Sequence, residues 1–380
     1  GGHRPPLQEK VEGAFYVWTK NEIESALADD GPPFVFRYGV EEGGNAAPDA
    51  DAHGELRGKN VLFERHTLAE TAAKFGESEE KMRARLNFAR TKLLAVRDRR
   101  PRPHLDDKIT TAWNGLMISA FARGGQVLAD AIYLQSAQRA ATFLRENLYD
   151  ANATTLARSY REGRSNVAGF ADDYAFVIQG LLDLYEAFGE SEWLRWAMDL
   201  QVTQDRLFYD AKHGGYFTTT GDDPSILLKM KDDSDSAEPA ASSVSALNLA
   251  RLGAMLDRAE YIKRAQATVQ AFGTQLASYP SGLPQLLVAH DFLTGPIRQI
   301  VLAGDPGEFQ NALRGIFLAR TIVLFADGTA GQEFLASAND AITEMKPVRG
   351  KPAAYVCENF TCQAPVTDAS ALRKLCSGGL

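Results

Sequence analysis

A two-helix unit recurs three times in this sequence, and it constrains the fold more than any single motif does. Acidic or polar residues stand at the start of each first helix: His104 to Lys108 in the first copy, Asp172 and Asp173 in the second, and Glu238 in the third. The second helices begin with an aromatic residue followed by an aliphatic one. Repetition at similar intervals along a chain indicates supersecondary units that stack on one another.

Apolar residues fall on one helical face in each first helix of the repeat, at the i, i+3, i+4, i+7 spacing of an amphipathic helix. They are Trp113, Leu116, Met117, Ala120 and Phe121 in the first copy, Val177, Leu181, Leu184 and Phe188 in the second, and Leu249, Leu252, Gly253 and Leu256 in the third. Many neighbouring apolar positions are Ala or Gly, which lets packed helices approach closely.

Antiparallel helix pairs of similar length build either a solenoid or a closed ring with an inner and an outer row of helices. In a ring, the starts of the inner helices gather at one mouth, which would bring the acidic residues towards a common cavity. After about residue 296 the pattern changes to strand (299–303), helix (308–318) and strand (320–325). We therefore predict helical hairpins over residues 1–295 and a small α/β segment over 296–380.

Net charge and cysteine content limit the function classes. The chain has 41 basic and 49 acidic side chains, a net charge of −8, which argues against a nucleic-acid surface because phosphate binding needs clustered Lys and Arg. No apolar run reaches the roughly 18 residues of a membrane span, and residues 1–6 lack the apolar core of a signal peptide. We expect a cytoplasmic protein that binds neither membrane nor nucleic acid.

The three cysteines, Cys357, Cys362 and Cys376, lie close to the C-terminal end. This pattern is not that of a disulfide scaffold, and a zinc site would need further ligands. Buried free thiols are the expected state of Cys357 and Cys362. Gly304 to Gly307 follow a strand, but without a dinucleotide or P-loop pattern they form a turn, so we predict no cofactor and no metal.

Five motifs occur in order along the chain. They lie at residues 12–18, 58–62, 103–116, 172–176 and 355–367. Together they resemble those of the spermatogenesis-associated thioredoxin-domain proteins and their bacterial homologues, over essentially the whole chain.

The family resemblance implies a fold more firmly than a function. Its members resemble a thioredoxin-like domain followed by a six-hairpin α/α toroid, similar to the toroids of N-acylglucosamine 2-epimerases and six-hairpin glycosidases. The expected fold class is therefore all-α, a partial or complete six-hairpin α/α toroid with a small α/β tail. The thioredoxin part and the first hairpins would precede residue 12, so we expect an incomplete ring, a possible partner in the missing N-terminal portion, and self-association through uncovered helix faces.

Paired carboxylates at the helix starts are the candidate catalytic groups. In a toroid that acts on sugars, two carboxylates flank the substrate, one as acid and one as base or nucleophile, and Asp106, Asp107, Asp172 and Asp173 could supply them. The alternative is helix capping, because Asp at a helix start accepts backbone N–H bonds and complements the helix dipole. Capping explains one Asp of each pair, not both.

Other polar and aromatic residues at the same helix starts are candidate substrate contacts. They are His104, Lys108, Trp113, Asn114, Tyr174 and Glu238. For Trp113 the alternative is core packing, and for His104 it is a plain loop position. The third helix start departs from the family, since Pro239 is followed by Ala240, Ala241 and Ser242 where members carry Ser, Gly and Asn.

Two function classes follow from these residues. The first is a carbohydrate-active enzyme, a sugar epimerase or isomerase or a glycoside hydrolase, that uses carboxylates at the inner-helix starts and takes a small sugar or glycan. The alternative is a non-catalytic toroid that binds carbohydrate or protein and accompanies a thioredoxin-like domain.

Overall fold

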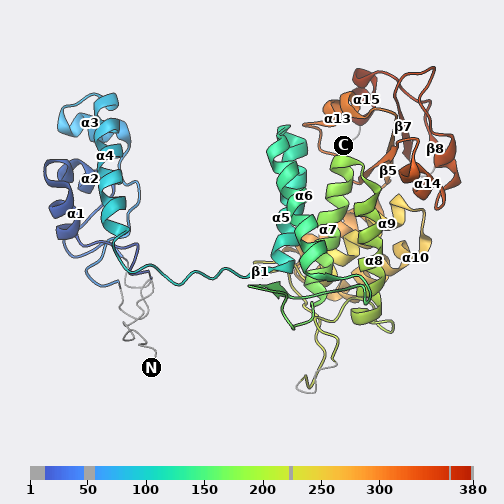
Figure 1. Ribbon diagram of the computed structural model, residues 1–380, viewed down its shortest axis with the longest axis horizontal. Coiled ribbons are helices and arrows are strands. Elements are labelled where there is room, and N and C mark those ends of the chain that lie inside the picture. The colour runs from blue at the N-terminus through green and yellow to red at the C-terminus, as the bar shows by residue number, and fades with distance from the viewer. Residues whose placement is uncertain (1–12, 47–55, 222–225, 359–360, 378–380) are drawn as a thin grey trace. The chain divides into compact units, whose positions relative to one another are not determined.

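The computed structural model describes residues 13–46, 56–221, 226–358 and 361–377. It contains two compact units, Gly1–Asp106 and Asp107–Leu380 (Figure 1). The N-terminal segment 1–6, in which no signal peptide was expected, lies outside the described residues.

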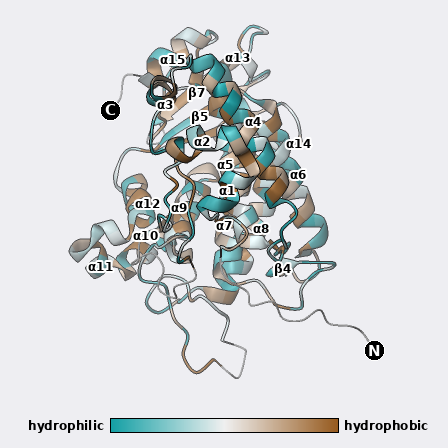
Figure 2. Cartoon of the chain, turned by 90° about the vertical axis from the view of Figure 1, so that its left-hand side faces the viewer, coloured by the Kyte–Doolittle hydropathy of each residue, from teal (hydrophilic) through white to brown (hydrophobic). Residues whose placement is uncertain are grey.

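The first unit is a small group of helices. Its helices are α1 (Lys20–Leu27), a 3₁₀ turn (Ala28–Asp30), α2 (Gly31–Arg37), α3 (Leu68–Phe75) and α4 (Glu79–Arg97). Thr19 and Glu22 form a capping box at the start of α1, because each supplies an acceptor for a backbone N–H that the first turn leaves unpaired. The core of this unit is apolar and includes Trp18, Ile23 and Phe34. Figure 2 shows hydrophilic and hydrophobic residues alternating along α4, as expected of a helix buried on one side.

Helical hairpins make up most of the second unit. The hairpins are α5 (Thr111–Leu128) with α6 (Ala131–Asn147), α7 (Ala171–Phe188) with α8 (Ser191–Phe208), and α9 (Ala241–Met255) with α10 (Ala259–Ala271), followed by α11 (Gly273–Ser278) and α12 (Pro284–Thr294). The first helices form one row, in which α5 packs on α7, α7 on α9 and α9 on α12. The second helices α6, α8 and α10 each pack on their own first helix. This arrangement is the predicted inner and outer row of an α/α toroid, and the described residues form a partial arc of it.

The close contact between α5 and α7 depends on two glycines. A Cβ on Gly115 would lie 2.5 Å from backbone atoms of Phe176 and Val177, and a Cβ on Gly180 would lie 2.7 Å from the carbonyl oxygen of Gly115. Real side-chain carbons do not reach such distances, so the two helices can cross at this separation only where both residues lack a side chain. The small residues in the repeat therefore have the packing role that the sequence predicted.

A buried charged cluster joins the inner helices α5, α7 and α9 near the ends opposite to their starts. Asp183 on α7 accepts hydrogen bonds from Arg123 on α5 at 2.9 Å and from Ser119 at 2.5 Å. Arg251 on α9 lies 2.8 Å from Asp183 and 2.9 Å from Glu186. Burial alone would raise the pKa of Asp183, but the charges of Arg251 and Arg123 hold it below its ordinary value. The cluster thus contains ionised groups that pair across helices.

A four-stranded sheet follows the hairpins. Its strands are β5 (Arg298–Ala303), β6 (Thr321–Ala326), β7 (Ala353–Glu358) and β8 (Thr361–Cys362), in the order β6-β5-β7-β8 (Figure 1). The pair β5–β6 is parallel and crosses over through α13 (Gly307–Leu313), whereas β5–β7 and β7–β8 are antiparallel. The predicted strands at 299–303 and 320–325 are confirmed. The predicted helix at 308–318 ends earlier, because the chain turns at Gly315, whose φ is +73°.

The remaining elements are short. They are β1 (Ile109–Thr110), β2 (Tyr149–Asp150), β3 (Thr155–Leu156), β4 (Ser159–Tyr160), α14 (Ala330–Ala336), two 3₁₀ turns (Pro280–Gly282 and Asp340–Glu344) and α15 (Ala369–Ser377). One hydrophobic core runs through the hairpins and the sheet. The predicted division of the chain into residues 1–295 and 296–380 remains a prediction. In the structure the hairpins are followed by the sheet within the second unit. Within the described parts of the chain, no helix is long and apolar enough to cross a membrane.

The expectation of free thiols at Cys357 and Cys362 is wrong. The two residues are directly opposite each other on β7 and β8 and form a disulfide. Sequence spacing alone could not indicate that the antiparallel pairing would bring them together. Cys376 on α15 is buried with a free thiol.

Candidate functional site

A cavity of about 460 Å³ lies where α7 and α9 begin. The start of α7 and the segment that leads into α9 form its walls. The lining residues are Phe170, Asp172, Phe176, Thr218, Asp232, Asp233, Ser234, Ser236, Ala237, Glu238, Pro239, Ala240 and Ala241. Two of the predicted helix starts therefore meet at one cavity.

The cavity walls carry acidic side chains and, among the described lining residues, no basic one. Asp172, Asp232, Asp233 and Glu238 contribute four carboxyl groups. Partial burial, reinforced by the charges of Asp172 and Asp233, raises the pKa of Asp232 above its ordinary value. Among the described residues, no cluster of three or more His, Cys, Asp or Glu side chains is arranged to hold a metal ion, these carboxyl groups included.

Arg158 joins the two aspartates at the start of α7. Its Nη1 atom lies 2.7 Å from Asp172 Oδ2 and 2.9 Å from Asp173 Oδ2. The guanidinium also lies over the Phe170 ring, 4.9 Å from the ring centroid, a cation–π distance. Arg158 therefore compensates the negative charge that Asp172 places on the cavity wall.

Asp173 links two inner helices. Its Oδ1 atom accepts the backbone N–H of Ala112 in the first turn of α5 at 2.8 Å, and its Oδ2 atom accepts that of Phe170 at 2.8 Å. The side chain is fully buried. Burial first, and then the charge of Asp172, raises the pKa of Asp173 to about 7, while Arg158 and the Phe170 N–H oppose the rise. The geometry is that of a helix cap shared between α5 and α7, which was the alternative role considered for this residue.

Trp113 and Glu238 connect the first and third repeats at the cavity. The indole Nε1 of Trp113 donates to Glu238 Oε1 at 2.6 Å. Trp113 is 56% exposed, so the alternative of core packing is wrong for this residue. Met117 and Ala120 on the same predicted apolar face are exposed as well. The face of α5 that is buried instead carries small residues such as Ala112 and Gly115.

A single aspartate holds the segment before α9 in place. Asp235 accepts the backbone N–H of Ala240 and that of Gln285, both at 2.8 Å. These bonds tie the segment to the starts of both α9 and α12. The neighbouring side chains of Asp232, Asp233, Ser234 and Ser236 are thereby presented to the cavity.

The other predicted site residues do not line the cavity. Tyr174 is buried in the core, and its hydroxyl accepts the Leu156 N–H at 2.9 Å. Asn114 donates to the Thr110 carbonyl oxygen at 2.9 Å. Asp107 pairs with Arg161 at 2.6 Å on the exposed surface.

The two candidates His104 and Asp106 belong to the first unit, and neither is among the cavity-lining residues. Lys108 is exposed and, like them, does not line the cavity. The structure thus brings Asp172 and Glu238 to the cavity, with Trp113 in contact with Glu238.

Several lining residues were missed from the sequence. Asp232, Asp233, Ser234 and Ser236 lie in one acidic and serine-rich run, and that composition is the signal that could have identified them. Arg158 gave no such signal, because it lies in an irregular segment and forms its ion pairs only in the folded chain.

Comparison with known proteins gives close relatives and distant structural likenesses. Spermatogenesis-associated protein 20 from Homo sapiens is 37% identical over 392 residues, which cover 97% of this chain and 50% of that protein. The Rattus norvegicus protein of the same name is 36% identical over 388 residues, 96% of this chain and 49% of its own length. The chain therefore spans about half the length of the curated relatives that it matches. No protein-family model matches the chain.

Solved structures resemble the chain only weakly. Cellobiose 2-epimerase from Bacillus thermoamylovorans aligns with a TM-score of 0.41 and 15% identity, over 69% of this chain and 68% of its own. A family 105 glycoside hydrolase from C. acetobutylicum aligns with a TM-score of 0.35 and 14% identity, over 57% and 63%. Scores of this size do not establish a shared activity.

Proposed function

The chain belongs to the family of spermatogenesis-associated protein 20, and we propose that its second unit carries a carbohydrate-active site in the cavity before α7 and α9. One observation carries the proposal. The cavity combines carboxyl groups in unlike environments with aromatic rings, in a volume of about 460 Å³ that suits a small sugar. Groups whose surroundings separate their proton affinities are the usual basis of acid–base catalysis near neutral pH.

Asp232 and Asp172 are the proposed acid and base. Asp232 retains its proton more readily than an ordinary aspartate, because it is partly buried beside two like charges. Asp172 pairs with the Arg158 guanidinium at 2.7 Å, which holds its carboxyl group in place on the cavity wall. Two carboxyl groups on one cavity, of which Asp232 holds its proton more readily than an ordinary aspartate, could transfer protons at two positions of a bound sugar, as isomerisation, epimerisation and glycoside hydrolysis all require.

The apolar wall and the rim would orient the ligand. Phe170, which is 38% exposed, offers apolar surface that could contact the C–H face of a sugar ring, while Ser234 and Ser236 offer hydroxyl groups. Glu238, fixed by the indole of Trp113 at 2.6 Å, is placed to accept a sugar hydroxyl. The proposed catalytic residues are therefore Asp232 and Asp172, and the proposed binding residues are Phe170 and Glu238.

Proton NMR of a sugar panel in D₂O tests the proposal. The panel holds reducing monosaccharides, their N-acetylated forms and β- and α-linked disaccharides. Epimerisation or isomerisation exchanges a ring-carbon proton for deuterium and gives a new anomeric signal, whereas hydrolysis gives new reducing ends. Turnover should fall by at least about 100-fold in Asp232→Asn, which removes a general acid.

Asp107→Asn is the matched control for this experiment. Asp107 is also an aspartate near a helix start, but it pairs with Arg161 on the surface and does not line the cavity. Turnover in Asp107→Asn should equal that of the unaltered chain. If both variants lose turnover equally, or neither loses it, the assignment of Asp232 is wrong.

A non-catalytic binding role is the second candidate, and one observation favours it. The wall at Pro239, Ala240 and Ala241 presents no polar side chain to the cavity, so a ligand against that wall would meet no group able to transfer a proton. This candidate predicts saturable sugar binding in the same NMR titration with no new signals from any sugar, and with binding weakened in Glu238→Ala.

A further inference from the structure

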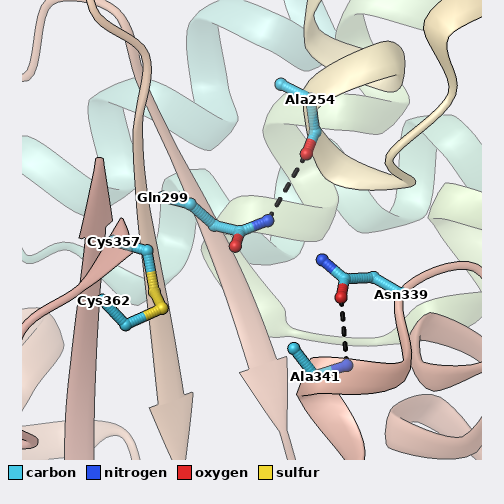
Figure 3. Close-up of a disulfide and its surroundings, with 6 residues drawn as sticks. All are labelled: Ala254, Gln299, Asn339, Ala341, Cys357 and Cys362. Carbon is cyan, nitrogen blue, oxygen red and sulfur yellow. Dashed lines mark hydrogen bonds between the residues drawn. A yellow bond between two sulfur atoms is a disulfide. The ribbon is translucent and has the colours of Figure 1, made fainter. Parts of the chain in front are cut away.

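The disulfide between Cys357 and Cys362 lies at the edge of the sheet, and its two cysteines differ in their exposure to solvent. It joins the last inner strand β7 to the edge strand β8 (Figure 3). Cys362 is exposed, as are Thr361 and Gln363 beside it, whereas Cys357 is 3% exposed. Cys362 is therefore the cysteine open to a reactant in solution, and Cys357 is sheltered in the sheet.

Backbone hydrogen bonds also tie the chain that follows Cys362 to β7. Gln363 N donates to Val356 O at 3.0 Å, and Ala354 and Val366 exchange two backbone bonds of 2.8 and 3.0 Å. On its other side, β7 pairs with β5 along six residue positions, from Arg298↔Glu358 to Ala303↔Ala353. Hydrogen bonds as well as the disulfide therefore link this part of the chain to the sheet. We expect the strands to stay paired when the disulfide is broken.

The cross-link also encloses little chain. The two cysteines are five residues apart, and a disulfide that closes a short loop restricts the unfolded chain least. Gln299, opposite Cys357 on β5, directs its amide to the Ala254 carbonyl oxygen at 3.4 Å (Figure 3). That bond links β5 to α9 and does not involve the sulfur atoms.

From the exposed position of Cys362, the paired backbone and the short loop, we propose that Cys357–Cys362 is a redox-active disulfide that a dithiol reductant exchanges through Cys362. The thiolate of the dithiol attacks Cys362 Sγ, and the bond between the two protein sulfurs breaks. The electron pair leaves on Cys357 Sγ, which takes up a proton. The second thiol of the reductant, as thiolate, then attacks the reductant's own sulfur in the mixed disulfide. The reductant becomes a disulfide, and Cys362 leaves as a thiolate that is protonated.

The net reaction transfers two electrons and two protons from the dithiol to the protein. It leaves two thiols on adjacent strands, close enough to re-form the bond when an oxidised dithiol partner is present. The proposal is independent of the sugar site, since the cavity contains none of these residues.

A trapping experiment on the full chain tests which sulfur is attacked. The probe is a thioredoxin whose second active-site cysteine is replaced by serine, so that the mixed disulfide cannot be resolved. Under native conditions the mixed disulfide should form on Cys362, as mapped by peptide mass spectrometry. A mixed disulfide on Cys357, or none until urea unfolds the chain, would overturn the proposal.

Matched single variants measure the difference in accessibility on which the proposal rests. Cys357→Ser leaves the exposed Cys362 as a thiol, and Cys362→Ser leaves the buried Cys357. Alkylation by a maleimide should be at least about tenfold faster in Cys357→Ser than in Cys362→Ser, and equal rates would contradict the proposed point of attack. Cys376→Ser is the control. Because Cys376 is a buried free thiol outside the disulfide, this change should leave the reduction rate unaltered.

Circular dichroism distinguishes a redox-active disulfide from a structural one. Reduction of the unaltered chain by dithiothreitol should release two alkylatable thiols while the far-ultraviolet spectrum stays the same. Loss of the helical or strand signal on reduction would show that the bond holds the fold together, and would overturn the proposal.

Discussion

Asp183 is the residue whose replacement should most clearly weaken the packing of the inner helices. It lies on α7, is 1% exposed, and meets Arg123 from α5 and Arg251 from α9 at 2.8 to 2.9 Å. Asp183→Asn keeps the size of the side chain and removes the charge. Arg251, itself only 3% exposed, then retains Glu186 as its one acidic partner at 2.9 Å.

The expected loss follows from the burial of the charges. Removing one partner of a buried ion pair costs about 3–5 kcal/mol, because the other charge stays buried and undercompensated. The Nη1 atom of Arg251 already lacks a partner among the described residues, so the cluster has no spare acceptor to offer it. Because Glu186 remains, we expect the lower end, about 3 kcal/mol. At about 2–4 °C per kcal/mol for a unit of this size, the melting temperature should fall by roughly 6–12 °C.

Urea unfolding followed by circular dichroism at 222 nm measures the effect. Asp107→Asn is the control, because its pair with Arg161 is about half exposed on both sides and such pairs contribute at most about 1 kcal/mol. A loss below about 1 kcal/mol in Asp183→Asn would refute the reasoning, since it would mean that the cluster does not hold α5, α7 and α9 together.

Four further predictions concern packing, pH, the cavity rim and association. Gly115→Ala should lower the free energy of unfolding by about 1–3 kcal/mol, because the added methyl group would lie 2.5 Å from the α7 backbone; an unchanged urea midpoint would contradict the close crossing. The pKa of Asp173 is raised from 3.8 to about 7 in the folded chain, so its contribution to stability is complete below pH 3.8 and is lost as the pH rises through 7. Unfolding curves should therefore show stability rising from about pH 7.5 to about pH 5, a trend that Asp173→Asn should reduce. Trp113→Phe should leave stability within about 1 kcal/mol, because the indole is 56% exposed, while weakening sugar binding measured by NMR. The chain should self-associate, because Trp113, Met117, Val127 and Leu128 expose apolar surface along α5; light scattering that shows a monomer at all concentrations would contradict this.

The helical hairpins could be predicted because their signal is local. Apolar residues such as Val177, Leu181 and Leu184 recur with the period of a helix, and all three are fully buried. Gly115 and Gly180 could be expected at a close helix contact for the same reason. A periodic pattern shows that a face is apolar, but not which element covers it. For that reason the exposure of Trp113 could not be derived from the sequence.

The candidate site was only partly predictable, because its residues are brought together by tertiary structure. Asp172 and Glu238 could be inferred from their positions at helix starts. Asp232 and Asp233 lie in a segment without periodicity, and the two backbone bonds to Asp235 that set its path join it to two different helices. The disulfide likewise depended on the antiparallel pairing of β7 with β8, which the spacing of the two cysteines does not encode.

The most direct test of the central claim is to locate a bound sugar. The sugar from the panel that gives the strongest NMR response would be soaked into crystals of the chain, and its position determined by X-ray diffraction. We expect it in the cavity before α7 and α9, with hydroxyl groups within hydrogen-bond distance of Asp172 and Asp232. A sugar bound elsewhere, or an empty cavity at saturating concentration of every sugar in the panel, would contradict the account.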